Sequence, residues 1–156
     1  MSNHLIDLLK TAKNRIDGGQ YAEALQVLES ALGYATEPWL EIEIHFQAAL
    51  CRYELGEYAG AAENLETALS IAEDMAHTEK KHIYDLLRLA YVNKPDYIKL
   101  AGLCRTLLNV EEDKTGLMSD LLNVYVVLDK WDEMARVLDE FSHIDLDADA
   151  VLTRIR

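Results

Sequence analysis

Residues 56–69 read Gly56-Glu57-Tyr58-Ala59-Gly60-Ala61-Ala62-Glu63-Asn64-Leu65-Glu66-Thr67-Ala68-Leu69, and their pattern predicts how the chain folds. Its frame, Gly-x-Tyr-x-x-Ala-x-x-x-Leu-x-x-Ala-Leu, also occurs at residues 19–32. The small residues fall three or four positions apart, so on an α-helix they share one face. A second helix can approach such a face closely, and larger side chains fill the space beside it. The repeat therefore predicts paired helices, with Ala24 and Ala61 buried where they meet.

The composition predicts an all-α fold. The chain has 156 residues, of which 50% are hydrophobic and only two are proline. This length is enough for one domain with a sizeable core, and the hydrophobic content argues against disorder. Ala, Leu and Glu dominate, and these residues favour helix. We expect a single domain over residues 1–156.

The charge is strongly acidic, with 15 Lys and Arg against 28 Asp and Glu and a formal net charge of −13. Such a surface repels phosphate groups, which argues against nucleic acid and anionic membranes as partners. It suits a basic or neutral partner, although plain solubility is the interpretation we favour. No signal peptide and no apolar run long enough for a membrane span are evident. Cys51 and Cys104 fall inside helical patterns, as reduced core cysteines do, so we expect a cytoplasmic protein.

Helices are predicted at about residues 3–17, 21–34, 39–55, 57–75, 80–92, 96–110, 114–128 and 130–142. Ser2 or Asn3 caps the first helix, and Gly18-Gly19 ends it. Pro38 suits the first turn of the third helix, which is apolar on more than one side. Thr78 is the predicted cap of the fifth helix. The helices form hairpins at about residues 3–35, 38–76, 79–110 and 113–143.

The last residues predict a short ninth helix over residues 146–156. Asp147 can cap it, and Ala148, Val151, Leu152 and Ile155 then share one face. We expect this amphipathic segment to fold back as a cap on the eighth helix. It would equally suit docking on a second molecule, which would make the C-terminal end a homodimer interface.

Aromatic residues mark a repeat, because Tyr21, Tyr58, Tyr97 and Trp131 each follow a turn, at separations of 37, 39 and 34 residues. The halves Tyr84-x₂-Leu87-Arg88-x₂-Tyr91 and Ala61-x₃-Leu65 follow the pattern of the tetratricopeptide repeat (TPR). Nearly the whole chain resembles this family, with two good hairpins and two divergent ones. The resemblance implies a right-handed α-solenoid of antiparallel helix pairs, closed by the capping helix, that serves as a protein-binding adaptor.

The resemblance also implies a concave groove lined by the first helix of each hairpin. The groove positions, matched residue by residue, are Leu9, Lys13, Phe46, Leu50, Tyr53, Asp85, Leu89 and Asn123. The Lys and Asn set by which one subclass grips a C-terminal carboxylate is absent, so a chaperone tail is not expected. Phe46, Leu50 and Tyr53 form an apolar stripe along the third helix, with Glu43 and Glu54 beside it. Such a stripe suits an amphipathic protein segment that carries basic residues. The same stripe could instead pack against neighbouring first helices, and the sequence leaves both interpretations open.

No motif predicts an enzyme, a metal site or a cofactor. His77 and His82 are five residues apart across a helix start, so they do not share a face as metal ligands would. Gly-x-Ser-x-Gly and phosphate-binding glycine loops do not occur. The alternative to an adaptor is a self-assembling structural unit whose stack ends form the interface.

Overall fold

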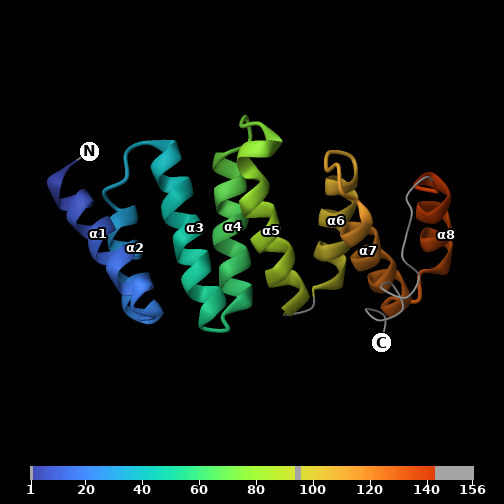
Figure 1. Cartoon of the computed structure of the whole chain (residues 1–156), viewed down its shortest axis with the longest axis horizontal. Helices are drawn as coiled ribbons and strands as arrows, with labels where there is room; N and C mark the ends of the chain where they lie inside the picture. Colours follow the sequence, from blue (N-terminus) through green and yellow to red (C-terminus); the bar gives the residue numbers. More distant parts are fainter. Residues whose placement is uncertain (1, 94–95, 143–156) are drawn as a thin grey trace. The chain divides into compact units, whose positions relative to one another are not determined.

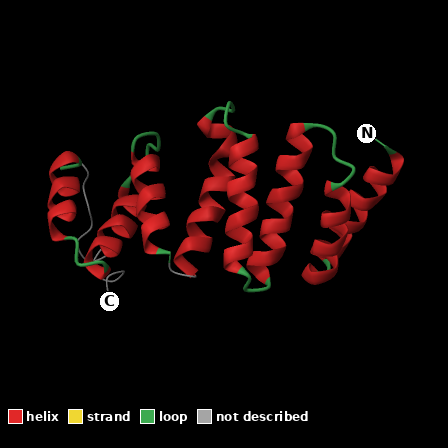
Figure 2. Ribbon diagram, turned by 180° about the vertical axis from the view of Figure 1, so that it is seen from behind, coloured by secondary structure: helices red, strands yellow, loops and turns green. Residues whose placement is uncertain are grey.

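The computed structural model describes residues 2–93 and 96–142, and within these the chain forms eight α-helices and no strand (Figures 1 and 2). The helices are α1 (Asn3–Asp17), α2 (Tyr21–Leu32), α3 (Pro38–Glu54), α4 (Tyr58–Ile71), α5 (His77–Asn93), α6 (Tyr97–Leu108), α7 (Thr115–Val127) and α8 (Trp131–Glu140). The all-α prediction is confirmed. The predicted ninth helix lies outside the described residues.

Individual side chains explain where three helices begin: caps at α1 and α6, and a proline at α3. The Ser2 hydroxyl accepts a hydrogen bond from the Leu5 amide at 3.2 Å, as the predicted cap of α1 requires. The Asp96 carboxylate accepts one from the Lys99 amide at the start of α6, also at 3.2 Å. Pro38 occupies the first turn of α3, where a missing N–H costs nothing.

One start was predicted wrongly. Thr78 is not a cap, because α5 begins at His77. The Ala76 carbonyl already accepts the Glu79 amide at 3.1 Å, and the His77 ring stacks on Tyr84 with its centroid 5.4 Å away. These two contacts extend the helix by three residues beyond the predicted start.

The same turn recurs before α2, α4 and α8. Its left-handed residue is Gly19 (φ 73°), Gly56 (φ 77°) or Asp129 (φ 57°). The next amide then donates to a carbonyl five residues back: Gln20 to Arg15, Glu57 to Arg52, and Lys130 to Tyr125, each at 2.8 Å. This arrangement satisfies helix-end carbonyls and reverses the chain in a fixed way. A recurring turn of one geometry is what a helical repeat requires.

The described helices pack in chain order, within two compact units that fall in residues 1–94 and 95–156. In the first unit, α1 packs on α2, α2 on α3, α3 on α4, and α4 on α5; in the second, α6 packs on α7 and α7 on α8. Such sequential packing is consistent with a helical repeat. The boundary falls inside the third predicted hairpin, and a single domain over the whole chain stays a prediction.

The core of the first unit is built from the small residues of the repeated frame and the aliphatic residues beside them. Ala24 and Ala61 are completely buried, as predicted. The helix α3 buries residues on several sides, among them Leu40, Ile42 and Ala49, because both α2 and α4 pack on it. Cys51 and Cys104 are both buried.

Within residues 2–93 and 96–142, no helix has both the length and the apolar character that a bilayer crossing needs.

Candidate functional site

An open cavity of about 350 Å³ lies between α1 and α3, over α2, and we call it the α1–α3 groove. Both helices descend from the top of Figure 1. The residues that line the groove are Leu9, Ala12, Lys13, Ile16, Asp17, Leu28, Leu40, Glu43 and Gln47.

The floor of the groove is aliphatic. Ala12, Leu28 and Leu40 are buried, while Leu9 and Ile16 are half-buried and stay partly open to solvent. Helical spacing explains this, since residues 9, 12 and 16 share one face of α1. An apolar side chain from a partner that covered Leu9 and Ile16 would gain the free energy of removing their exposed surface from water.

The rim of the groove is polar and charged. Lys13 and Asp17 come from α1, and Glu43 and Gln47 come from α3. The Gln47 amide nitrogen donates to Glu43 Oε1 at 2.8 Å, which fixes that carboxylate at the edge. Polar groups around an apolar floor are the usual arrangement of a binding cleft.

Two predicted groove residues, Leu9 and Lys13, therefore meet Glu43 and Gln47 across one cavity. The lining residues outside the predicted set are Ala12, Ile16, Asp17, Leu28, Leu40, Glu43 and Gln47, of which Glu43 was expected only as a neighbour of the apolar stripe. A signal for two of them was present, because Ile16 and Asp17 continue the helical spacing of Leu9 and Lys13. Leu28 lines the groove because of the way α2 packs against α1 and α3. The spacing of residues within one helix does not reveal that packing.

The predicted stripe on α3 is half-buried and contacts its neighbours. Phe46 meets the His82 ring edge-on, with the centroids 4.7 Å apart. The Tyr53 hydroxyl accepts a hydrogen bond from the Asn93 side chain at 2.9 Å, and its ring meets Tyr58 edge-on at 5.2 Å. The contacts with His82 and Asn93 on α5 are those that the packing interpretation expects, while partner binding at Phe46, Leu50 and Tyr53 stays a prediction.

The other predicted positions lie elsewhere. Asp85 pairs with Lys81 at 3.5 Å on α5, and Leu89, on the same helix, is 48% exposed. Asn123 is half-buried on α7, in the second compact unit. None of these three lines the α1–α3 groove.

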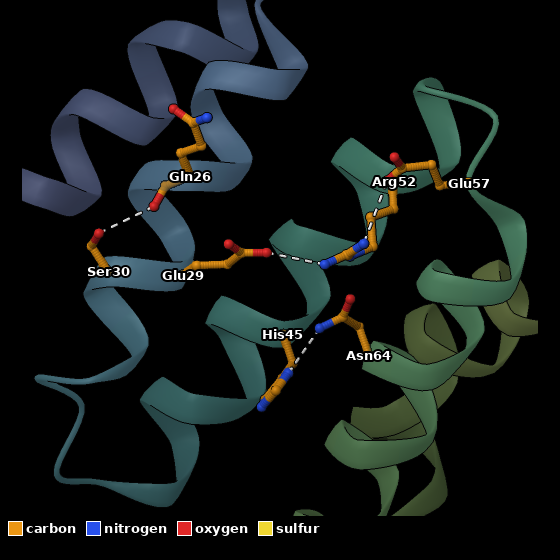
Figure 3. A network of polar contacts seen from close by, with 7 residues as sticks. All are labelled: Gln26, Glu29, Ser30, His45, Arg52, Glu57 and Asn64. Atoms are coloured by element: carbon orange, nitrogen blue, oxygen red, sulfur yellow. Dashed lines mark hydrogen bonds and ion pairs between the residues drawn. The ribbon is translucent and has the colours of Figure 1, made fainter.

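A polar network holds α2, α3 and the start of α4 together (Figure 3). Arg52 on α3 reaches Glu29 on α2, Nη2 to Oε1, at 3.0 Å, and Glu57 before α4, Nη1 to Oε2, at 3.4 Å. Gly60 makes room for this arginine, because a Cβ there would lie 3.1 Å from Arg52 Cδ and Nη1. Arg52 Nε is buried and has no hydrogen-bond partner among the described residues. The network fixes the position of α3 against α2 and the start of α4.

Side-chain contacts at equivalent positions of the repeat join three pairs of helices. The pairs are Arg52 with Glu29 at 3.0 Å, Tyr91 with Glu66 at 2.5 Å, and Arg105 with Tyr125 at 2.8 Å. The repeat is marked by the aromatic residues Tyr21, Tyr58, Tyr97 and Trp131. In each pair, the first partner along the chain lies eight residues after one of these aromatic residues, and the second lies six residues before the next one. The three contacts link α2 to α3, α4 to α5, and α6 to α7. The chemistry of the pair changes, but its place in the repeat does not.

His45 on α3 and Asn64 on α4 form a further contact, Nδ1 to Nδ2, at 3.1 Å (Figure 3). With the amide nitrogen as donor, the ring accepts at Nδ1 and is neutral. Burial lowers the pKa of His45, and the nearby Glu41 carboxylate opposes this shift. The neutral ring is therefore part of the α3–α4 packing.

The buried Cys51 thiol is not activated as a nucleophile. Burial raises the pKa of the Cys51 thiol, which disfavours the nucleophilic thiolate. Within the described residues, no three His, Cys, Asp or Glu side chains lie close enough to hold a metal ion.

No protein-family model matches the chain, and none of the curated proteins matches it. The fold and the groove therefore carry the functional argument.

Proposed function

We propose that this chain is a TPR-like adaptor whose α1–α3 groove binds an extended or helical segment of another protein. The packing in chain order, the recurring turn and the matching polar pairs support a repeat of helical hairpins. We further propose that these hairpins follow the right-handed solenoid of that family. The observation that carries the function is the groove itself, a cavity of about 350 Å³ with an aliphatic floor and a charged rim.

The size of the groove suits a few side chains of a partner. Its volume lies at the lower end of the range of about 300–1,000 Å³ that is typical of ligand cavities. A few side chains of a peptide fill such a space, while a folded domain does not. The net charge of −13 disfavours nucleic acid as the occupant.

A peptide selection tests this proposal. The full chain would be screened against a random-peptide phage library, and one selected peptide would be synthesised. Methyl NMR of the labelled protein would then locate it. We expect shifts at Leu9, Ile16 and Leu40 and none at Ile98, which is 77% exposed on α6. Failure to select any peptide, or shifts confined to other helices, would contradict the proposal.

A second candidate is self-assembly through α8. Trp131 and Leu138 are seven residues apart on one side of this helix and are 56% and 41% exposed. Large exposed apolar side chains on one face are typical of an interface. Light scattering of the wild type and of Leu138→Ser tests this candidate, which predicts a dimer that the substitution converts to a monomer.

A further inference from the structure

Two carboxylates give the α1–α3 groove a negative edge. Asp17 is the last residue of α1, where the carbonyl groups at the helix end already produce a negative potential. Glu43 faces the same cavity from α3. Because a carboxylate at the C-terminal end of a helix is itself unfavourable, a cation brought by a partner would relieve the charge of Asp17.

The chain itself supplies little compensating charge. Arg15, the basic residue in the last turn of α1, donates to the Gln20 side chain at 2.9 Å and pairs with Glu23 at 3.5 Å. Among the described residues, neither Asp17 nor Lys13 forms an ion pair. With Asp17, Glu43 and Lys13 counted together, the rim keeps one net negative charge.

The floor of the groove favours an aliphatic side chain of the partner. All of its apolar residues are aliphatic, and Leu9 and Ile16 remain half open to solvent. A flexible aliphatic side chain fits between such residues with few unfavourable contacts.

We infer that the groove recognises a basic and aliphatic peptide, in which Leu, Ile, Val or Met lies within one helical turn of Lys or Arg. The aliphatic side chain covers the floor at Leu9 and Ile16, and the cation lies beside Asp17 and Glu43. This inference rests on the proposed function, since it names the chemistry of the segment that the same groove binds.

The test uses the peptide from the phage selection and a copy in which every Lys and Arg is replaced by Gln. Fluorescence anisotropy would measure the affinity of both for the full chain at about 50 mM and about 300 mM salt. We expect the Gln copy, or the protein variant Asp17→Asn with Glu43→Gln, to bind roughly threefold to tenfold more weakly at low salt. The difference should shrink at high salt.

The matched control is Glu73→Gln with Asp74→Asn, which removes the same charge at two exposed residues that follow α4. We expect this variant to bind the peptide as tightly as the wild type. Equal weakening in both double variants would overturn the inference, because the effect would then come from the overall charge. Selected peptides that lack Lys and Arg, yet shift the methyl groups of Leu9 and Ile16, would overturn it while leaving the proposed function intact.

Discussion

The Arg52 guanidinium lies 3.0 Å from the Glu29 carboxylate, and this ion pair joins α3 to α2. The arginine side chain is only 28% exposed, whereas the related Arg15–Glu23 pair on the first hairpin is open to solvent, at 46% and 58%. Arg15 and Arg52 occupy the same place in the repeat, six residues before Tyr21 and Tyr58. Both pairs join two helices, α1 to α2 and α2 to α3, so the two arginines offer a matched comparison of a more exposed and a more buried guanidinium.

We predict that Arg52→Gln lowers the free energy of unfolding by about 1–2 kcal/mol, because Glu29 and Glu57 lose a charged donor. Arg15→Gln should cost less than about 0.5 kcal/mol, as exposed pairs do. Urea unfolding of the two variants measures both values. Equal losses would show that Arg52 does not hold the helices together.

Gly60 and Gly102 both lie inside helices but differ in their surroundings. A methyl group at Gly102 meets nothing within 4 Å, so Gly102→Ala should raise the free energy of unfolding by about 0.5–1 kcal/mol. At Gly60 the methyl group would press on Arg52, so Gly60→Ala should be neutral or destabilising. When Arg52→Gln removes the obstructing guanidinium, Gly60→Ala should recover part of the gain in unfolding free energy that is expected at Gly102. A double-mutant cycle of Gly60→Ala and Arg52→Gln measures this effect. An equal gain at both glycines would contradict the close approach of Arg52.

Ala61 is completely buried on α4, while Ala59 on the same helix is exposed. We predict that Ala61→Leu overpacks the core and lowers the free energy of unfolding by about 1–3 kcal/mol. Ala59→Leu should change it by less than about 0.5 kcal/mol. Thermal melts of the two variants check this, and an unchanged melting temperature for Ala61→Leu would refute the packing of that face.

The His45–Asn64 contact predicts a pH dependence. Burial lowers the pKa of His45 in the folded chain below its ordinary value of 6.5. The unfolded chain therefore binds a proton at His45 more readily than the folded chain. The contribution of neutral His45 to the free energy of unfolding is present above the pKa of His45 in the unfolded chain, and it is lost as the pH falls. From about pH 7.5 to about pH 5, wild type should lose more unfolding free energy than His45→Gln. Identical losses in urea titrations of the two proteins would rule this out.

The helices could be predicted from the sequence because their ends depend on nearby residues. Gly56 takes the left-handed turn and Ala61 the buried position, and both follow from residue type alone. The turn at Asp129 lacks glycine, yet aspartate tolerates positive φ, and its carboxylate accepts the Trp131 indole N–H.

The groove was predicted only in part, because it depends on contacts between helices. Leu9 and Lys13 were predicted from their positions in the repeat. Leu40 lines the cavity only because of where α3 lies relative to α1. Phe46 lies in the predicted stripe, and its contact with His82 arises only once α5 packs near α3. Periodicity within one helix identifies a face, but it does not identify the neighbour that covers it.

Blocking the α1–α3 groove tests the proposed function most directly. Lys13→Cys can be labelled with a bulky maleimide, because Cys51 and Cys104 are buried while Lys13 is exposed. Glu73→Cys, labelled in the same way, is the control at an exposed residue outside the groove. The affinity of the selected peptide is measured for each protein before and after labelling. We predict that the label at residue 13 weakens binding by at least about tenfold and that the label at residue 73 leaves it unchanged; unchanged affinity after labelling at residue 13 would contradict binding in this groove.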